Sequence, residues 1–120
     1  MEFEIETTPM SDGLAMLVTV HGELDLATNA WIQDVAQDVI WHQRPVIFDL
    51  ADCSYIDAAS FRQILELSTG PSVRLALVIP HRGQAAKVLT VADVDATVGL
   101  FETSTGAVAW LRPPSSARAI

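Results

Sequence analysis

The stretch that decides the fold is residues 45–65, PVIFDLADCSYIDAASFRQIL, where a run of β-forming residues gives way to an amphipathic helix. The first part, PVIFDL, is apolar enough to be a strand covered on at least one face. Helical spacing then places three apolar residues on one side: Phe61, Ile64 and Leu65. Asp57 precedes this helix and is expected to cap it by accepting from the N–H of residue 59 or 60. The small residues that follow leave the first turn open to a neighbour.

Working outward, a second apolar run, VRLALVI (73–79), ends at Pro80 and predicts another central strand. Shorter strands are expected at FEIE (3–6), LAMLVTV (14–20) and VGLF (98–101). An Asp-Gly pair separates the first two, which indicates a hairpin. Helical spacing predicts further helices at 26–41, 83–92 and 104–112, the last capped by Thr103 or Ser104.

This order of elements predicts an α/β domain. We expect a mixed, mostly parallel central sheet of about five strands, joined by right-handed crossovers, with about four helices packed mainly on one face. A chain of 120 residues fits one domain. We place that domain at residues 1–112 and expect 113–120, which follow helix-stopping prolines, to be a mobile tail.

Composition excludes several classes of function. The net charge is −8 without any basic cluster, so nucleic acid is not an expected partner. The acidic start MEFEIETT is unlike a signal peptide, and no apolar run approaches the length of a membrane span, so we expect a cytoplasmic protein without membrane insertion. Cys53 is the only cysteine, which rules out an internal disulfide and favours a core or half-exposed thiol.

No pattern of catalytic or metal-binding residues stands out. His21, His42 and His81 are scattered without metal-ligand spacing and are interpreted as surface or loop residues. Asp49 and Asp52 flank the end of a central strand, where carboxylates can serve acid–base or Mg²⁺ chemistry but more often form turns. The three tryptophans, Trp31, Trp41 and Trp110, are interpreted as parts of buried helix faces. We expect no enzyme activity, metal or cofactor.

Two segments carry a resemblance to a known family. VHGELDLATNAWIQ follows the second expected strand, and VIFDLADCSYIDAASFRQIL spans the third strand and second helix. The G-E-L-D of the first, the D-L and I-D pairs of the second, and the elements that follow resemble a STAS domain of the bacterial anti-sigma factor antagonist family. The resemblance covers residues from about 3 to 111.

The resemblance implies a protein-binding module that regulates transcription. Such proteins bind an anti-sigma factor, usually a kinase-like ATPase, and so free a sigma factor. Docking would use the 22–28 loop and the start of the second helix, which makes the expected partner-binding residues Glu23, Asp25, Ala27, Thr28, Asp57, Ala58, Ala59, Ser60 and Arg62. For Asp25 an N-cap of the first helix is an equally good interpretation. Neither the partner's identity nor the oligomeric state follows from the sequence.

The family's phosphorylation switch departs from its pattern here. Family members carry D-S-[ST]-G at the start of the second helix, whereas this chain reads Asp57, Ala58, Ala59 and Ser60. The acceptor position is therefore Ala59, which has no hydroxyl. Ser60 could be an acceptor shifted by one position, but we favour a small packing residue, because one step turns a side chain by about 100° around a helix.

Two other functions remain open. The first keeps the fold and makes the chain a non-switching scaffold subunit of an ABC transporter or of a stressosome-like complex. The second is a small nucleotide-handling enzyme that would use Asp25, Asp49 and Asp57.

Overall fold

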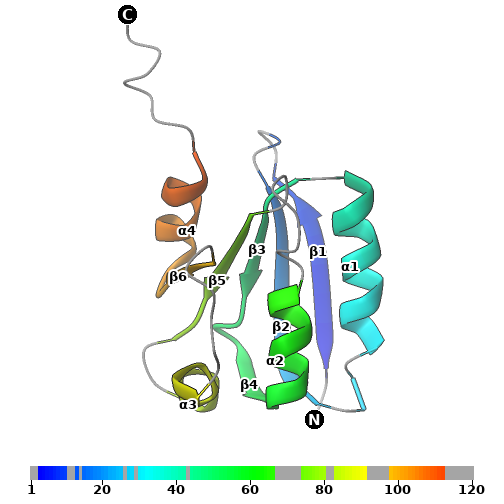
Figure 1. The fold of residues 1–120 in the computed structure, drawn as a ribbon, viewed down its shortest axis with the longest axis vertical. Coiled ribbons are helices and arrows are strands. Elements are labelled where there is room, and N and C mark those ends of the chain that lie inside the picture. Colours follow the sequence, from blue (N-terminus) through cyan, green and yellow to red (C-terminus); the bar gives the residue numbers. More distant parts are fainter. Residues whose placement is uncertain are drawn as a thin grey trace, which may run out of the picture.

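The structure is a computed structural model that describes residues 3–10, 13, 15–25, 27–28, 30–42, 44–66, 74–80, 83–91 and 98–112. Five strands lie side by side in the order β1-β2-β3-β5-β6, and a sixth, β4, pairs with β2 (Figure 1). The strands are β1 (Glu4–Pro9), β2 (Met16–Leu24), β3 (Val46–Asp49), β4 (Cys53–Ile56), β5 (Leu75–Val78) and β6 (Gly99–Phe101). The helices are α1 (Ala30–His42), α2 (Ala58–Leu65), α3 (Gln84–Val91) and α4 (Ser104–Leu111).

The sheet is mixed, as the sequence predicts. β1 and β2 form an antiparallel hairpin, while β2, β3, β5 and β6 run parallel to one another. Gly13, the glycine of the Asp-Gly pair, has a φ of 73° and donates its N–H to the carbonyl of Met10 at 2.9 Å. That left-handed backbone conformation suits glycine, which explains why the turn signal works.

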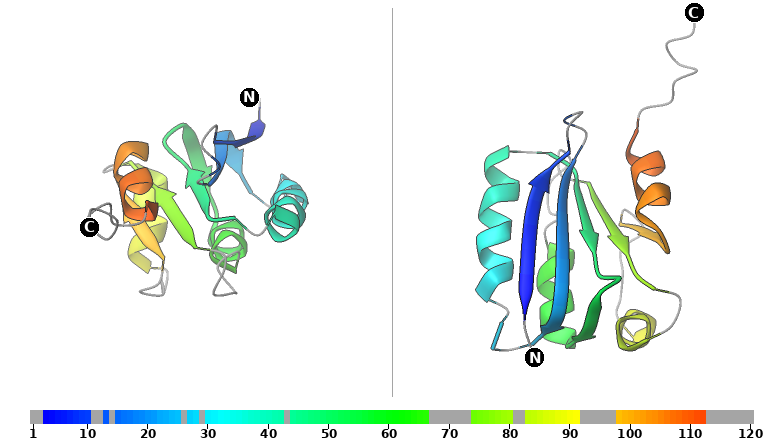
Figure 2. Two further views of the ribbon diagram at one scale, coloured as in Figure 1. Left: turned by 90° about the horizontal axis from the view of Figure 1, so that it is seen from above. Right: turned by 180° about the vertical axis from the view of Figure 1, so that it is seen from behind.

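Two apolar cores lie on the two faces of the sheet. Figure 2 shows α1 and α2 on one side of the sheet and α4 on the other. The larger core joins side chains of β2, β3 and β5 to those of α1, α2 and α3; its helix residues include Ile32, Val35, Phe61, Ile64 and Ala85. The smaller core packs Ala107 and Leu111 of α4 against the opposite face of β3 and β5. Three helices on one face and one on the other confirm the expected arrangement.

β4 is a strand that the sequence analysis did not predict. β2 is long enough to pair with β3 along its first half and with β4 at its end. The register shifts between Gly22 and Glu23, and Gly22 has a φ of 97°. The extra residue of this irregularity, Ser54, lies on β4. The left-handed backbone of Gly22 itself favours glycine, so the G of G-E-L-D has a structural reason.

Two expectations about the first helix are wrong. α1 begins at Ala30 rather than at 26, because a turn precedes it in which the N–H of Thr28 donates to the carbonyl of Asp25 at 3.0 Å. Trp31 is 50% exposed instead of buried, with its ring 6.2 Å from that of Phe3. Trp110 is half-buried against Phe101. The expectations for the side chains of Trp41, His42 and His81 and for the tail at 113–120 fall outside the described part of the chain.

Candidate functional site

The start of α2 forms the centre of the candidate site. Asp57 is the N-cap, and its Oδ1 accepts the N–H of Ser60 at 2.7 Å, which confirms the capping role predicted from the sequence. Ala58 and Ala59 follow with exposed side chains. The first turn of this helix therefore presents two methyl groups to the outside, and no large side chain at these two positions covers its backbone.

The 25–28 turn forms the second part of the site. The Asp25 carboxylate accepts the N–H of Ala27 at 3.0 Å, and the N–H of Asp25 donates to the Thr28 hydroxyl at 2.9 Å. Thr28 in turn donates to the carbonyl of Glu23 at 3.0 Å. Asp25 thus stabilises this turn and does not cap α1, which corrects one of its two interpretations.

A backbone contact joins these two parts. The N–H of Asp57 donates to the carbonyl of Leu24 at 3.1 Å, and Leu24 is paired with Ile56 across β2 and β4. The end of β2 and the start of α2 are therefore held side by side. Of the expected partner-binding residues, Glu23, Ala27, Ala58, Ala59 and Arg62 are exposed, and Asp25, Thr28 and Asp57 are half-buried.

Ser60 lies differently from the other expected residues. Its side chain is 0% exposed, and its hydroxyl oxygen has no hydrogen-bond partner among the described residues. It faces the interior beside Phe61 and Ile64, which are also fully buried. This position is the one that the packing interpretation of Ser60 expects.

Sequence reasoning missed two residues near the site. Gln84, at the start of α3, hydrogen-bonds the backbone of Ile56 immediately before Asp57. Tyr55 is exposed on β4 and is paired with Glu23 of β2. Both depend on β4, a strand of four residues without a strong pattern of its own, so no signal in the sequence placed them here.

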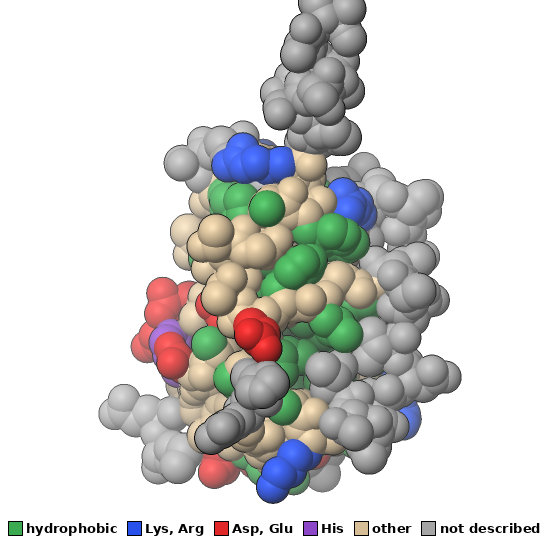
Figure 3. Space-filling model, turned by 90° about the vertical axis from the view of Figure 1, so that its left-hand side faces the viewer, with side chains coloured by type: hydrophobic (Ala, Val, Ile, Leu, Met, Phe, Trp, Pro, Cys, Tyr) green, Lys and Arg blue, Asp and Glu red, His purple; other side chains and the backbone are tan. Residues whose placement is uncertain are grey.

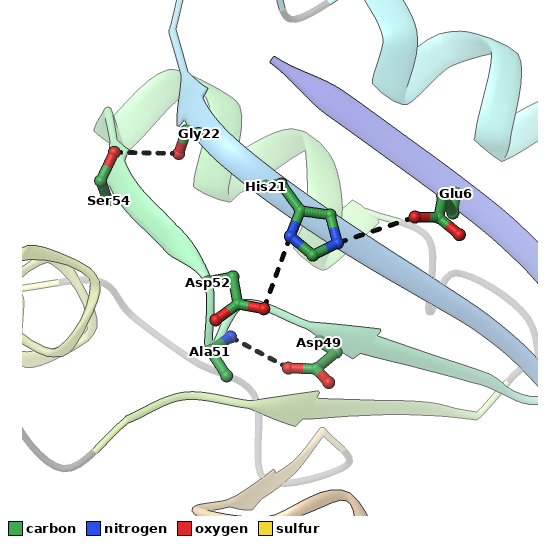
Figure 4. A network of polar contacts seen from close by, with 7 residues as sticks. All are labelled: Glu6, His21, Gly22, Asp49, Ala51, Asp52 and Ser54. Atoms are coloured by element: carbon green, nitrogen blue, oxygen red, sulfur yellow. Dashed lines mark hydrogen bonds and ion pairs between the residues drawn. The ribbon is translucent and has the colours of Figure 1, made fainter. Parts of the chain in front are cut away.

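The aspartates at the end of β3 take part in turns and ion pairs (Figure 4). The Asp49 carboxylate accepts the N–H of Ala51 at 2.9 Å, as a turn-forming aspartate does. Asp52 lies 3.4 Å from Nδ1 of His21, whose Nε2 is 3.7 Å from Glu6. This geometry agrees with the structural interpretation of both aspartates.

Strand pairing also creates a cluster that no sequence motif indicates. Glu4 lies opposite His21 in the β1–β2 register, and ligand atoms of Glu4, Glu6 and His21 lie within 4.8 Å of one another. The pKa of the Glu4 carboxyl is raised, because the neighbouring Glu6 hydrogen-bonds to it and repels its charge. The outer surface of this hairpin therefore carries an excess of negative charge.

Cys53 is buried at the start of β4. Its thiol donates to the carbonyl of Tyr55 at 3.1 Å, and burial raises its pKa above the ordinary value. A buried thiol of this kind is a poor nucleophile, in keeping with the interpretation of Cys53 as a core residue.

Across the described part of the chain, every helix is too short or too polar to cross a bilayer.

Comparisons with known proteins place the fold. No curated protein sequence matches the chain. Among solved structures, an anti-sigma factor antagonist from Mycobacterium paratuberculosis is similar with a TM-score of 0.80 and 15% identity, over 93% of this chain and 96% of that one. The anti-sigma factor antagonist SpoIIAA in its unphosphorylated form has a TM-score of 0.62 and 18% identity, over 99% and 100% of the two chains.

A third structure, the Bacillus cell fate determinant SpoIIAA in its phosphorylated form, has a TM-score of 0.57 and 15% identity, over 92% of this chain and 100% of that one. At such identities these likenesses show the fold alone. The sequence model of the STAS domain, however, matches residues 5–107, which include the strands from β2 to β6, all of β1 except Glu4, and the site described above. The chain therefore belongs to the STAS domain family.

Proposed function

We propose that this chain is an anti-sigma factor antagonist that binds a kinase-like anti-sigma factor through the start of α2 and the 25–28 turn. We further propose that it works without a phosphorylation switch at Ala59. The partner would be sequestered by this binding, which would free a sigma factor for transcription. No chemical step by this chain is required.

The observation that carries the proposal is the exposed first turn of α2. Ala58 and Ala59 present a small, uncharged surface, and the Asp57–Leu24 hydrogen bond of 3.1 Å holds the neighbouring turn beside it. Exposed polar side chains lie on the elements that adjoin this surface: Glu23 at the end of β2, Tyr55 on β4 and Arg62 on α2. A small apolar centre with a polar rim is the usual anatomy of a protein interface.

The absence of a hydroxyl at Ala59 supports a permanently available surface. Phosphorylation adds a charge of about −1.5 to −2, which disrupts a partner contact by repulsion and desolvation. Similar solved structures include SpoIIAA in both unphosphorylated and phosphorylated forms. Here the residue at the position that corresponds to the acceptor is Ala59, which cannot be phosphorylated. Regulation would therefore have to act on the partner or on the amount of this protein.

Binding to purified anti-sigma factors of the ATPase type from the same genome tests the proposal. Ala59→Glu should abolish binding in calorimetry, because it places a charge at the centre of the surface. A carboxylate in the first turn of a helix is compatible with the helix dipole, so folding should survive. Ala59→Ser should bind as the original chain does and should become a substrate for the partner's kinase activity.

The matched control is Ala109→Glu, which puts the same charge on an exposed position of α4, away from the α2 surface. It should bind normally. If Ala59→Glu binds every such partner as well as Ala109→Glu does, the proposed surface is wrong. Capture of a transporter ATPase instead of an anti-sigma factor, again lost in Ala59→Glu, would replace the proposed partner by the scaffold function.

A further inference from the structure

One edge of the sheet is formed by β1. This strand ends the strand order, and within the described residues its only strand partner is β2. Glu4, Glu6, Thr8 and Pro9 are exposed. A free edge offers a row of backbone donors and acceptors to any extended chain that can lie beside it.

One face of this edge is acidic. Glu4 and Glu6 point to the same side of β1 because they are two residues apart, and His21 lies opposite Glu4 on β2. Figure 3 shows acidic side chains gathered around the histidine at one margin of the molecule. The raised pKa of Glu4 reflects crowded negative charge, which a cation beside it would relieve.

The other face of the same edge is apolar. An open groove of about 170 Å³ is lined by Phe3, Glu4, Ile5 and Trp31. Half of the Trp31 side chain is exposed there, although tryptophan has a large apolar ring that is usually mostly buried. Half-exposed aromatic residues next to a groove are typical anchors for a binding partner.

We infer that β1 binds an extended peptide segment of a partner protein, in which basic residues alternate with apolar ones. Added beside β1, such a strand places its basic side chains against Glu4 and Glu6 and its apolar side chains against the groove at Trp31. The alternation follows from the two-residue period of a strand, since the two faces of β1 differ in character. This surface adjoins the 25–28 turn, because the N–H of Trp31 donates to the Thr28 carbonyl at 3.1 Å, but it does not use the start of α2. The inference does not depend on the function proposed for that helix.

A second copy of this chain fits the edge poorly. Antiparallel pairing of β1 with itself would set Glu4 or Glu6 opposite a carboxylate of the copy in the registers centred on residues 4 to 6. Like charges directly opposite on neighbouring strands destabilise the pairing. The acidic face therefore selects a basic strand over self-association.

Synthetic peptides test this inference. We would titrate the full chain, in the presence of a chelator, with a peptide of about eight residues that alternates Lys and Val. The backbone amide signals of the protein should shift along β1, and hydrogen exchange of these amides should slow. A peptide with Glu in place of Lys should bind at least about fivefold more weakly, as expected for the exchange of cross-strand attraction for repulsion. A version N-methylated on the backbone should not bind.

Matched variants separate this site from general attraction to an acidic protein. Glu4→Gln with Glu6→Gln should weaken the Lys peptide about fivefold, and Trp31→Ala should also weaken it. Asp34→Asn with Glu66→Gln removes the same charge from exposed positions on α1 and at the end of α2 and should change little. Equal weakening by the two double variants, equal binding of the N-methylated peptide, or a dimer formed through β1 would overturn the inference.

Discussion

The side-chain amide of Gln84 makes both hydrogen bonds that the backbone of Ile56 would otherwise make to a neighbouring strand. Its Oε1 accepts the N–H of Ile56 and its Nε2 donates to the Ile56 carbonyl, each at 2.6 Å. Ile56 immediately precedes the N-cap Asp57. The beginning of α3 therefore holds the end of β4 in place just where the candidate surface starts.

Replacement of Gln84 by Leu should lower the free energy of unfolding by about 1 to 3 kcal/mol, because it leaves two backbone groups of Ile56 unpaired. Urea denaturation measures this. Gln84→Glu keeps the acceptor but sets a carboxylate oxygen against the Ile56 carbonyl, so it should also destabilise the domain. Gln33→Leu, a change of the same kind on the exposed side of α1, is the control and should be nearly neutral. A Gln84→Leu variant as stable as this control would contradict the role assigned to the contact.

Asp57→Ala should destabilise the domain by about 1 kcal/mol, the usual cost of losing an N-cap. The Ser60 N–H would lose the acceptor that now lies at 2.7 Å. Asp57→Ser restores a capping oxygen and should recover most of the loss, which thermal unfolding can measure. If Ala and Ser at this position are equally stable, capping is not the main contribution of Asp57.

Ser60→Ala should leave stability unchanged or raise it by up to about 1 kcal/mol, because it removes a buried hydroxyl that has no partner among the described residues. Ser60→Asp should instead cost about 3 kcal/mol or more, since it buries a charge. Incubation with a partner kinase and ATP, followed by mass spectrometry, should detect no phosphate on Ser60. Phosphate there would mean that the first turn of α2 opens to the kinase.

Cys53 gives a prediction about pH. Its thiol has a raised pKa in the folded state, so its contribution to stability is complete below the unfolded pKa of about 8.5 and is lost as the pH rises through the folded value. Stability should therefore fall at alkaline pH, and less so in Cys53→Ala. Iodoacetamide should alkylate Cys53 much more slowly in the folded chain than in urea. Equal rates at the same pH would show that the thiol is accessible.

The sequence predicts the fold well where hydrophobic periodicity is strong. The runs around Val46 and Leu75 become the buried strands β3 and β5, and Phe61 and Ile64 face the core of the sheet. The caps Asp57 and Thr103 are also where the sequence places them. Local chemistry determines these features, so a single sequence contains them.

Features that depend on pairing between distant segments could not be predicted. β4 has four residues and becomes a strand only because the end of β2 lies beside it. Glu4 and His21 meet through the hairpin register, which residue spacing alone does not reveal. Asp25 had two good interpretations, and its hydrogen bonds to Ala27 and Thr28 select a turn.

The register of β2 against β3 and then β4 has a consequence for how the chain tolerates changes in length. From Thr19 to Gly22 β2 advances by one residue fewer than the segment from Asp49 to Cys53 that pairs with it. Because β2 pairs with both β3 and β4, the length of the connection between β3 and β4 is fixed by β2. One inserted or deleted amino acid would turn Tyr55 inward and Ile56 outward. Loop grafts, tags and fusion points in members built this way should avoid that connection.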